Sequence, residues 1–187
     1  LESGSKLRAA IIDCMLYSED AAAISTARQL YQDTPLAELS ADLRPSIIGA
    51  AVRYSDQPAD IVSQLLEAYQ ATQSADLRSD IAAAVTTTRD AEQLARLIGL
   101  LTNTDTIRSQ DTVHWFVDLL RNRYGREAAW RWMRSQWSWI EQTFASDKSH
   151  DYFPRYAAML LMTRQQLAEY REFFTPLRRD QSLVRAI

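Results

Sequence analysis

The chain has 187 residues, of which 47% are hydrophobic, and it carries a formal net charge of −3. A single cysteine, Cys14, excludes an internal disulfide and favours a reducing compartment, so we expect a cytoplasmic protein. No apolar run approaches the ~20 residues of a membrane span. Residues 1–5 lack the basic region and apolar core of a signal peptide. We therefore expect no membrane association.

The charged residues are unevenly distributed along the chain. Residues 1–104 contain 8 Lys and Arg against 14 Asp and Glu, whereas residues 105–187 contain 13 against 10. An acidic first half argues against a nucleic-acid groove along the chain, because such a groove needs positive charge. For the second half, ordinary solvated charge is favoured. The alternative is a surface that faces an acidic partner or a carboxylate.

Four pairs of an apolar residue followed by arginine recur along the chain. They are Leu7-Arg8, Leu43-Arg44, Leu77-Arg78 and Ile107-Arg108, spaced 36, 34 and 30 residues apart. Repeats of this length are typical of stacked helix pairs. The four Gly and five Pro lie between periodic segments, which favours a helical chain. The sequence predicts an all-α fold, a single HEAT- or armadillo-like α-solenoid domain over residues 1–187. Each pair should lie near the start of alternate helices.

The second helix of each repeat is marked by a capping or helix-opening residue. Asp20, Pro58 and Asp90 stand at the starts of helices predicted over residues 21–32, 59–71 and 91–101.

The first helix of each repeat has its own start signals. In the second copy we expect Asp42 or a neighbour to cap the helix and Pro45 to fall in its first turn, and in the third copy Ser74 and Asp76 offer caps. Cys14 lies among apolar residues of the first predicted helix, so we expect it to be a buried core thiol.

The fourth copy departs from this pattern, because Ser-Gln-Asp-Thr at residues 109–112 follows its arginine. Two interpretations stay open. Either this helix faces something other than a neighbouring helix, or a shift of register turns Gln110 and Asp111 to water.

Residues 130–139 hold four of the five tryptophans. On one helix, Trp130, Met133, Trp137, Ile140 and Phe144 would share a stripe, with Trp132 and Trp139 on a second face. We favour a helix packed on both sides. A stacking platform, a membrane-seeking helix and a face that docks on another domain are the alternatives.

Signatures of catalysis are missing from the sequence. Asp111, His114 and Asp118 share a helix face that could hold a metal, but a solvated face is favoured. The sequence contains no H-E-x-x-H, G-x-S-x-G, P-loop or G-x-G-x-x-G motif. We therefore expect no catalytic and no metal-ligating residue, and no cofactor, in this chain.

Five segments, four of them in the second half, carry a more specific signal. They are T-T-T-R-D-A-E-Q-L at 86–94, I-R-S-Q-D at 107–111, L-L-R-N-R-Y-G-R-E-A-A-W at 119–130, Q-W-S-W-I at 136–140 and M-T-R-Q-Q-L-A-E-Y-R-E-F-F at 162–174. In this order and spacing they resemble the C-terminal domain of the aminopeptidase N family of zinc metallopeptidases, which has puromycin-sensitive, endoplasmic-reticulum and bacterial members. The resemblance covers about residues 77–174.

The resemblance implies that the chain is a non-catalytic C-terminal piece of a larger enzyme. In such enzymes the zinc ligands lie in an upstream catalytic domain, and the helical domain closes over it, forms an internal chamber and limits access to peptides. Its implied partners are that catalytic domain and peptide substrates. The alternative is a stand-alone helical-repeat scaffold that binds a protein partner.

The resemblance and the polar fourth copy together suggest a site. We expect Gln110, Asp111, His114 and Arg121 to line one chamber-facing surface, where Arg121 would pair with the C-terminal carboxylate of a peptide. The alternative for Arg121 is a surface or helix-capping role. Asn122 and Gly125 are assigned to a structural turn, with Gly125 as a helix C-cap before a new helix.

Overall fold

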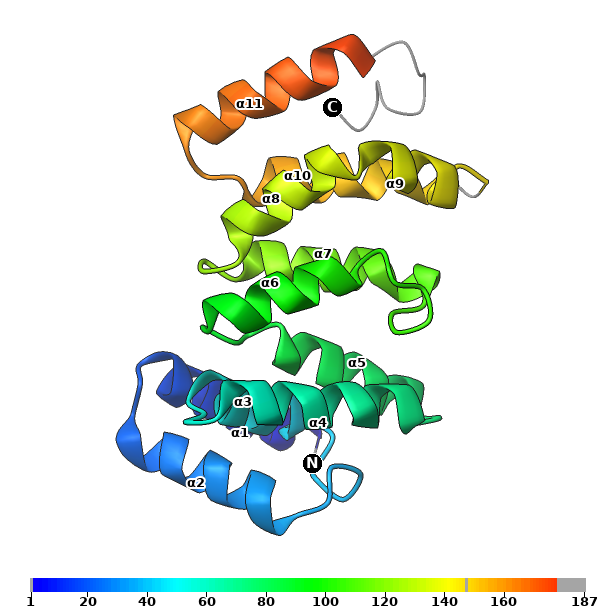
Figure 1. Cartoon of the computed structure of the whole chain (residues 1–187). Helices are drawn as coiled ribbons and strands as arrows, with labels where there is room; N and C mark the ends of the chain where they lie inside the picture. The colour runs from blue at the N-terminus through cyan, green and yellow to red at the C-terminus, as the bar shows by residue number, and fades with distance from the viewer. Residues whose placement is uncertain (1, 147, 178–187) are drawn as a thin grey trace. The chain divides into compact units, whose positions relative to one another are not determined.

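The structure, a computed structural model, describes residues 2–146 and 148–177, and every regular element within those ranges is helical (Figure 1). The all-α class predicted from the sequence is therefore confirmed. The chain divides into two compact units, Leu1–Gln93 and Leu94–Ile187, which are described separately. That the whole chain forms one α-solenoid domain stays a prediction.

The first unit contains five complete helices within its described residues, coloured blue to teal in Figure 1: α1 (Glu2–Tyr17), α2 (Ala21–Asp33), α3 (Arg44–Arg53), α4 (Pro58–Ala71) and α5 (Ala75–Val85). The boundary between the units falls in α6 (Ala91–Leu100). The bounds of α2, α4 and α6 differ from the prediction by one residue each.

The second unit continues with α7 (Ser109–Arg121), α8 (Arg126–Ser135), α9 (Trp137–Phe144), α10 (Tyr152–Leu160) and α11 (Arg164–Phe174), with short 3-10 turns at Ser149–Asp151 and Thr175–Leu177. Among these helices, α7 packs against α8 and α10.

Side-chain caps start several helices where the sequence predicts them. Asp20 accepts a hydrogen bond from the backbone N–H of Ala23 (2.8 Å), and Ser74 accepts one from Leu77 (3.2 Å). We expected Asp42 or a neighbour to cap α3, and Asp42 itself does not. The N-cap is Leu43, which makes no side-chain cap hydrogen bond, and the chain enters α3 through a tight turn followed by a proline in the first turn. That proline has no N–H to satisfy, which lessens the need for a cap.

The repeated arginine holds the segment that precedes its helix. Arg44 is buried and donates to the carbonyl oxygen of Leu39 (3.1 Å) and to the carboxylate of Asp80 on α5 (3.0 Å). Arg78 donates to the carbonyl oxygen of Tyr69 in the last turn of α4 (3.4 Å). A cation beside the carbonyls of a helix end is favourable, which gives a physical reason for Arg78. The acceptor of Arg44, Leu39, lies between α2 and α3 and not at a helix end.

The arginines of the first and fourth copies of the repeat lie differently from those of the second and third. Leu7-Arg8 lies inside α1 and not at its start, so the expected equivalence of all four pairs is wrong there. Arg108 directly precedes α7 as expected, but it pairs with Asp111 at 2.8 Å.

The core of the first unit is built around α3, which packs against α1, α2 and α5. Its buried apolar residues are Ile47, Ile48, Ala50, Ala51 and Val52. Helix α1 buries Leu16 and half-buries Ile12 on the side that meets α2 and α3. The prediction that Cys14 is a core thiol is wrong, because Cys14 lies on another side of α1 and is exposed.

The aromatic segment forms two helices and not one. Gln136 ends α8 and precedes α9, and the hydroxyl of Ser135 donates to the carbonyl oxygen of Trp132 (2.9 Å), a local bond that competes with helix continuation. The predicted stripe is nevertheless buried throughout: Trp130, Met133, Trp137, Ile140 and Phe144. Trp130, Trp132 and Trp137 are therefore packing residues, as expected, and Trp139 is half-buried, but the prediction of a single helix is wrong.

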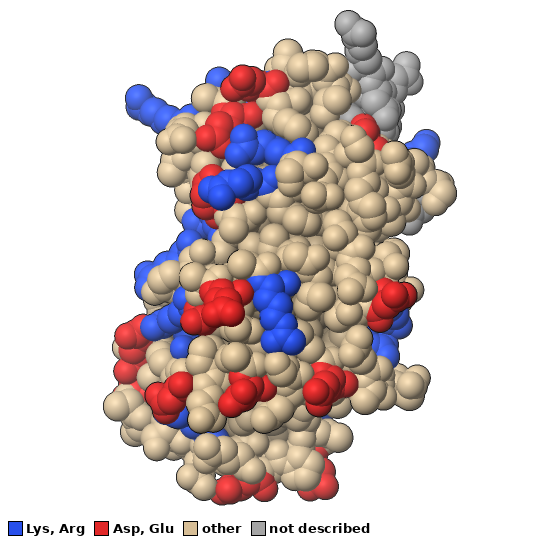
Figure 2. Space-filling view, in the orientation of Figure 1, with Lys and Arg blue, Asp and Glu red and all other residues tan. Residues whose placement is uncertain are grey.

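Figure 2 shows one face of the molecule, on which the Asp and Glu side chains of the first unit are spread over the surface and not gathered in one place. Ion pairs neutralise some of them, such as Glu19 with Arg89 (2.7 Å) and Asp56 with Arg28 (2.7 Å). This distribution is typical of a solvated surface.

Candidate functional site

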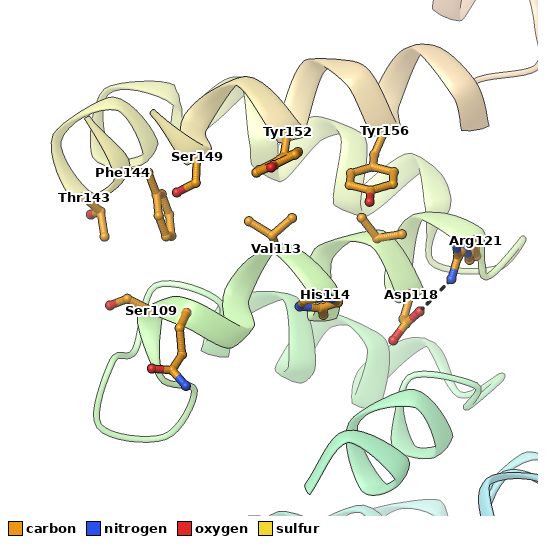
Figure 3. Close-up of a pocket in the computed structure, with 12 residues that line it drawn as sticks. Ser109, Val113, His114, Asp118, Arg121, Thr143, Phe144, Ser149, Tyr152 and Tyr156 are labelled. Carbon is orange, nitrogen blue, oxygen red and sulfur yellow. Dashed lines mark hydrogen bonds and ion pairs between the residues drawn. The ribbon is translucent and has the colours of Figure 1, made fainter. Parts of the chain in front are cut away.

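The second unit contains an open cavity of about 720 Å³. One wall is α7, and the other runs from the end of α9 through the Ser149–Asp151 turn to α10 (Figure 3). This volume lies within the range of pockets that bind small molecules or a few residues of a peptide. Segments about 40 residues apart in sequence therefore meet at one site.

Helix α7 supplies its wall because its side chains are sorted by the helical period. Gln110, His114, Asp118 and Arg121 recur at intervals of three or four residues and so line one face, which borders the cavity. The opposite side of the helix buries Trp115 and its apolar neighbours in the core. The strong separation of polar and apolar side chains thus fixes which face looks into the cavity.

Three of the four expected site residues line this cavity, namely Gln110, His114 and Arg121. Asp111 does not line it. It is one position further along the helix, which turns it by about 100° from Gln110, and its carboxylate pairs with Arg108.

Arg121 and Asp118 form the charged end of the cavity. A guanidinium nitrogen of Arg121 lies 3.3 Å from Oδ1 of Asp118, and the Arg121 side chain is 62% exposed (Figure 3). Burial raises the pKa of Asp118, and the neighbouring Arg121 and His114 offset part of that rise. Asp118 therefore holds the arginine in place, but burial makes its ionised form less favourable than that of a solvated carboxylate.

The wall opposite α7 is largely aromatic. Tyr152 and Tyr156 lie one turn apart on α10, with ring centroids 6.4 Å apart, and Tyr152 faces Val113 across the cavity (Figure 3). Ser149 and Thr143 add hydroxyl groups at the other end. The cavity thus has an apolar middle and polar ends.

The tyrosines and Asp118 were missed as site residues, although two signals pointed to them. Asp118 follows His114 by four residues and so shares its helix face. Tyr152 and Tyr156 are also four residues apart, and they flank Phe153, which is fully buried. Their nearness to α7 depends on tertiary packing, which sequence spacing does not reveal.

The turn after α7 determines where Arg121 lies. Asn122 is the C-cap of α7, and its side-chain oxygen accepts a hydrogen bond from the backbone N–H of Tyr124 (3.0 Å). Gly125 is the N-cap of α8 and not the C-cap of α7. A Cβ atom there would meet Cδ2 of Leu94 at 3.1 Å and the carbonyl oxygen of Leu119 at 3.2 Å, so close approach favours glycine.

The described residues include all four side-chain types that commonly bind metal ions, His, Cys, Asp and Glu. None of their His, Cys, Asp and Glu side chains form a group of three or more that could hold a metal ion. Within the described ranges, these side chains therefore do not supply the three or more protein ligands of a zinc site. In the same part of the chain, no helix has the length and apolar character needed to span a membrane.

The fold and the site together define an all-α domain with an open, partly charged cavity. A family model described as ERAP1-like C-terminal domain matches residues 2–187. Aminopeptidase N of Lactobacillus helveticus is 33% identical over 167 residues, which cover 88% of this chain and 20% of that enzyme. Aminopeptidase N of Lactococcus lactis subsp. cremoris (strain MG1363) is 31% identical over 183 residues, 97% of this chain and 22% of that enzyme. Endoplasmic reticulum aminopeptidase 1 of Mus musculus is 27% identical over 124 residues, 66% of this chain and 13% of that enzyme.

The chain therefore belongs to the ERAP1-like C-terminal domain family and is a C-terminal domain of the aminopeptidase N family. The resemblance noted in the sequence is confirmed. The chain spans about a fifth of the length of the bacterial aminopeptidases that it matches.

Proposed function

We propose that this chain is the non-catalytic C-terminal domain of a zinc-dependent aminopeptidase, where it covers the catalytic domain, forms part of an internal chamber and controls the access of peptides. Membership of the family supports this proposal, as does the length of the bacterial relatives, which leaves room for a catalytic domain in the same polypeptide. The alternative of a stand-alone scaffold is not favoured, because these relatives are much longer enzymes.

In this proposal the catalytic residues and the zinc ion belong to another part of the parent enzyme. Zinc would activate water and polarise the scissile carbonyl there. The described residues of this chain would bind and orient the peptide.

The observation that carries the proposal is the cavity bordered by α7 and α10. Its charged end offers the guanidinium of Arg121, which has five N–H donors and uses one of them in the ion pair with Asp118. The remaining donors can accept the C-terminal carboxylate of a peptide, which matches a guanidinium in geometry. The apolar middle, between Val113 and the two tyrosines, would take the side chain next to that carboxylate.

The expected contribution of Arg121 is modest but measurable. Exposed ion pairs contribute at most ~1 kcal/mol, whereas a site sheltered by a second domain has a lower effective dielectric and a stronger attraction. Asp118 partly neutralises the charge of the arginine, so we expect a contribution of ~1 kcal/mol, as in an exposed ion pair. A loss of ~1 kcal/mol corresponds to about a fivefold rise in the Michaelis constant.

The test is Arg121→Ala in the full-length enzyme, assayed with long peptides and with short chromogenic amides that cannot reach from the catalytic domain to the cavity. KM for the long peptides should rise about fivefold, while the constants for the short substrates should stay unchanged. Arg123→Ala is the matched control, since Arg123 is in the same turn but lies over the ring of Tyr124 (4.7 Å) and does not line the cavity. Equal changes for both substrate classes, or for both variants, would contradict the proposed role.

A further inference from the structure

Helix α1 carries a second apolar face that is open to solvent in this structure. Leu7 is 63% exposed, Ile11 51% and Met15 39%, and Cys14 is exposed beside them. The first three residues recur every four positions and so form one continuous stripe along the helix. We name these four residues the α1 stripe.

Leu7, Ile11 and Met15 lie on a different side of the helix from the residues that join α1 to its neighbours. Cys14 lies at the edge of the stripe, where it also lines a cavity bordered by α3 and α5. Ile12 and Leu16 pack toward α2 and α3, and they follow Ile11 and Met15 by one position each, about 100° further around the helix. A helix with two separate apolar faces is typical of one that is packed on both sides.

The rest of the first unit shows what such packing looks like. Helix α3 lies against α1 and α2 and also against α5, and six of its consecutive residues, Ile47 to Val52, are buried. In a repeat architecture each helix pair covers the exposed face of the next. Helix α1 has apolar residues on two faces, as a helix packed on both sides does. Within the described residues, only the face with Ile12 and Leu16 packs against neighbouring helices.

We propose that the α1 stripe is covered in the parent enzyme by an amphipathic helix from the polypeptide that precedes Leu1. The length of the relatives argues for this occupant, because the chain spans 20% and 22% of the two bacterial aminopeptidases and its family is described as a C-terminal domain. Most of such an enzyme therefore precedes the matched region, and a preceding helix pair would continue the stacking of the repeat. The inference rests on membership of the family and is independent of the peptide site.

Cys14 makes the proposal testable, because it is the only cysteine in the chain and belongs to the stripe. The full-length enzyme is treated with N-ethylmaleimide, and modification of the tryptic peptide of residues 9–28 is followed by mass spectrometry in native and in denaturing buffer. Burial under a helix should slow the native reaction at least about tenfold relative to the denatured one, since reaction then requires local opening. The variant Gln70→Cys, at an exposed position of α4, is the matched control and should react at similar rates in both buffers.

A substitution provides a second measurement. Ile11→Asp places a charge in the stripe, and it should lower the melting temperature of the full-length enzyme by several degrees, whereas Gln70→Asp should not. Rapid native modification of Cys14 together with an unchanged melting temperature for Ile11→Asp would overturn the proposal. Protection of Cys14 that disappears on dilution would also overturn it, because the occupant would then be a second copy of the enzyme.

Discussion

The ion pair between Arg44 and Asp80 offers the sharpest test of how the repeats are joined. It links α3 to α5, with the arginine and carboxylate side chains only 10% and 20% exposed and 3.0 Å apart. Burial is the main influence on Asp80 and raises its pKa, although Arg44 partly offsets the rise. The cost of removing these charges from water is therefore not fully repaid by their attraction.

Two substitutions should consequently behave very differently. Asp80→Ala leaves the charge of Arg44 buried with the carbonyl oxygen of Leu39 as its remaining described acceptor, and should destabilise the first unit by about 3 kcal/mol. The double variant Arg44→Met, Asp80→Leu replaces both charges by apolar groups of similar size. It should lie within about 1 kcal/mol of the unmodified chain, because such exchanges are often neutral.

Urea denaturation of the chain measures this difference. With a denaturant dependence of about 2 kcal/mol per molar, Asp80→Ala should lower the midpoint followed by circular dichroism by about 1.5 M. All five tryptophans lie in the second unit, at residues 115, 130, 132, 137 and 139, so fluorescence follows that unit separately. A shift of Asp80→Ala below about 0.3 M, or a double variant as unstable as Asp80→Ala, would refute the reasoning.

Two further predictions concern titrating groups in the second unit. Burial raises the pKa of Asp118, so its protonated form favours folding. This contribution is fully present below the unfolded pKa of about 4 and is lost as pH rises through the higher folded pKa. Asp118→Asn should remove that loss, so the urea midpoint at pH 7 minus the midpoint at pH 4 should be more positive in the variant than in the unmodified chain. A more negative difference in the variant would contradict the sign. The indole N–H of Trp130 donates to Oε2 of Glu169 (2.9 Å), and this bond is the main cause that lowers the pKa of Glu169. Trp130→Phe should raise that pKa toward its ordinary value in a carboxyl-resolved NMR titration, and an unchanged pKa would exclude the bond as the cause.

Much of the helical architecture could be predicted because its signals are local. Asp20 and Ser74 cap the helices that they precede, and the bounds of α2, α4 and α6 follow within one residue. Local signals failed where tertiary packing or competing bonds decide. Gln136 interrupts an apolar stripe that reads as one helix, and Cys14 is exposed although apolar residues flank it.

In the candidate site too, local spacing predicted some residues, whereas tertiary packing determines the others. The face of α7 follows from helical spacing, so Gln110, His114 and Arg121 were placed together. Asp111 was included with the polar residues of the fourth copy, but its carboxylate pairs with Arg108. The opposite wall comes from α10, more than 30 residues later, and no spacing in the sequence connects Tyr152 to α7.

Photo-crosslinking tests the central claim most directly. A long peptide with p-benzoylphenylalanine at its C-terminus is irradiated with the full-length enzyme, and adducts are located by mass spectrometry. If the cavity holds the far end of the peptide, adducts should fall in the tryptic peptides of residues 109–121, 149–155 and 156–164. Arg121→Ala, in which the first of these peptides becomes residues 109–123, should reduce the adducts in all three. Adducts confined to residues 1–93 or to the catalytic domain would contradict the account.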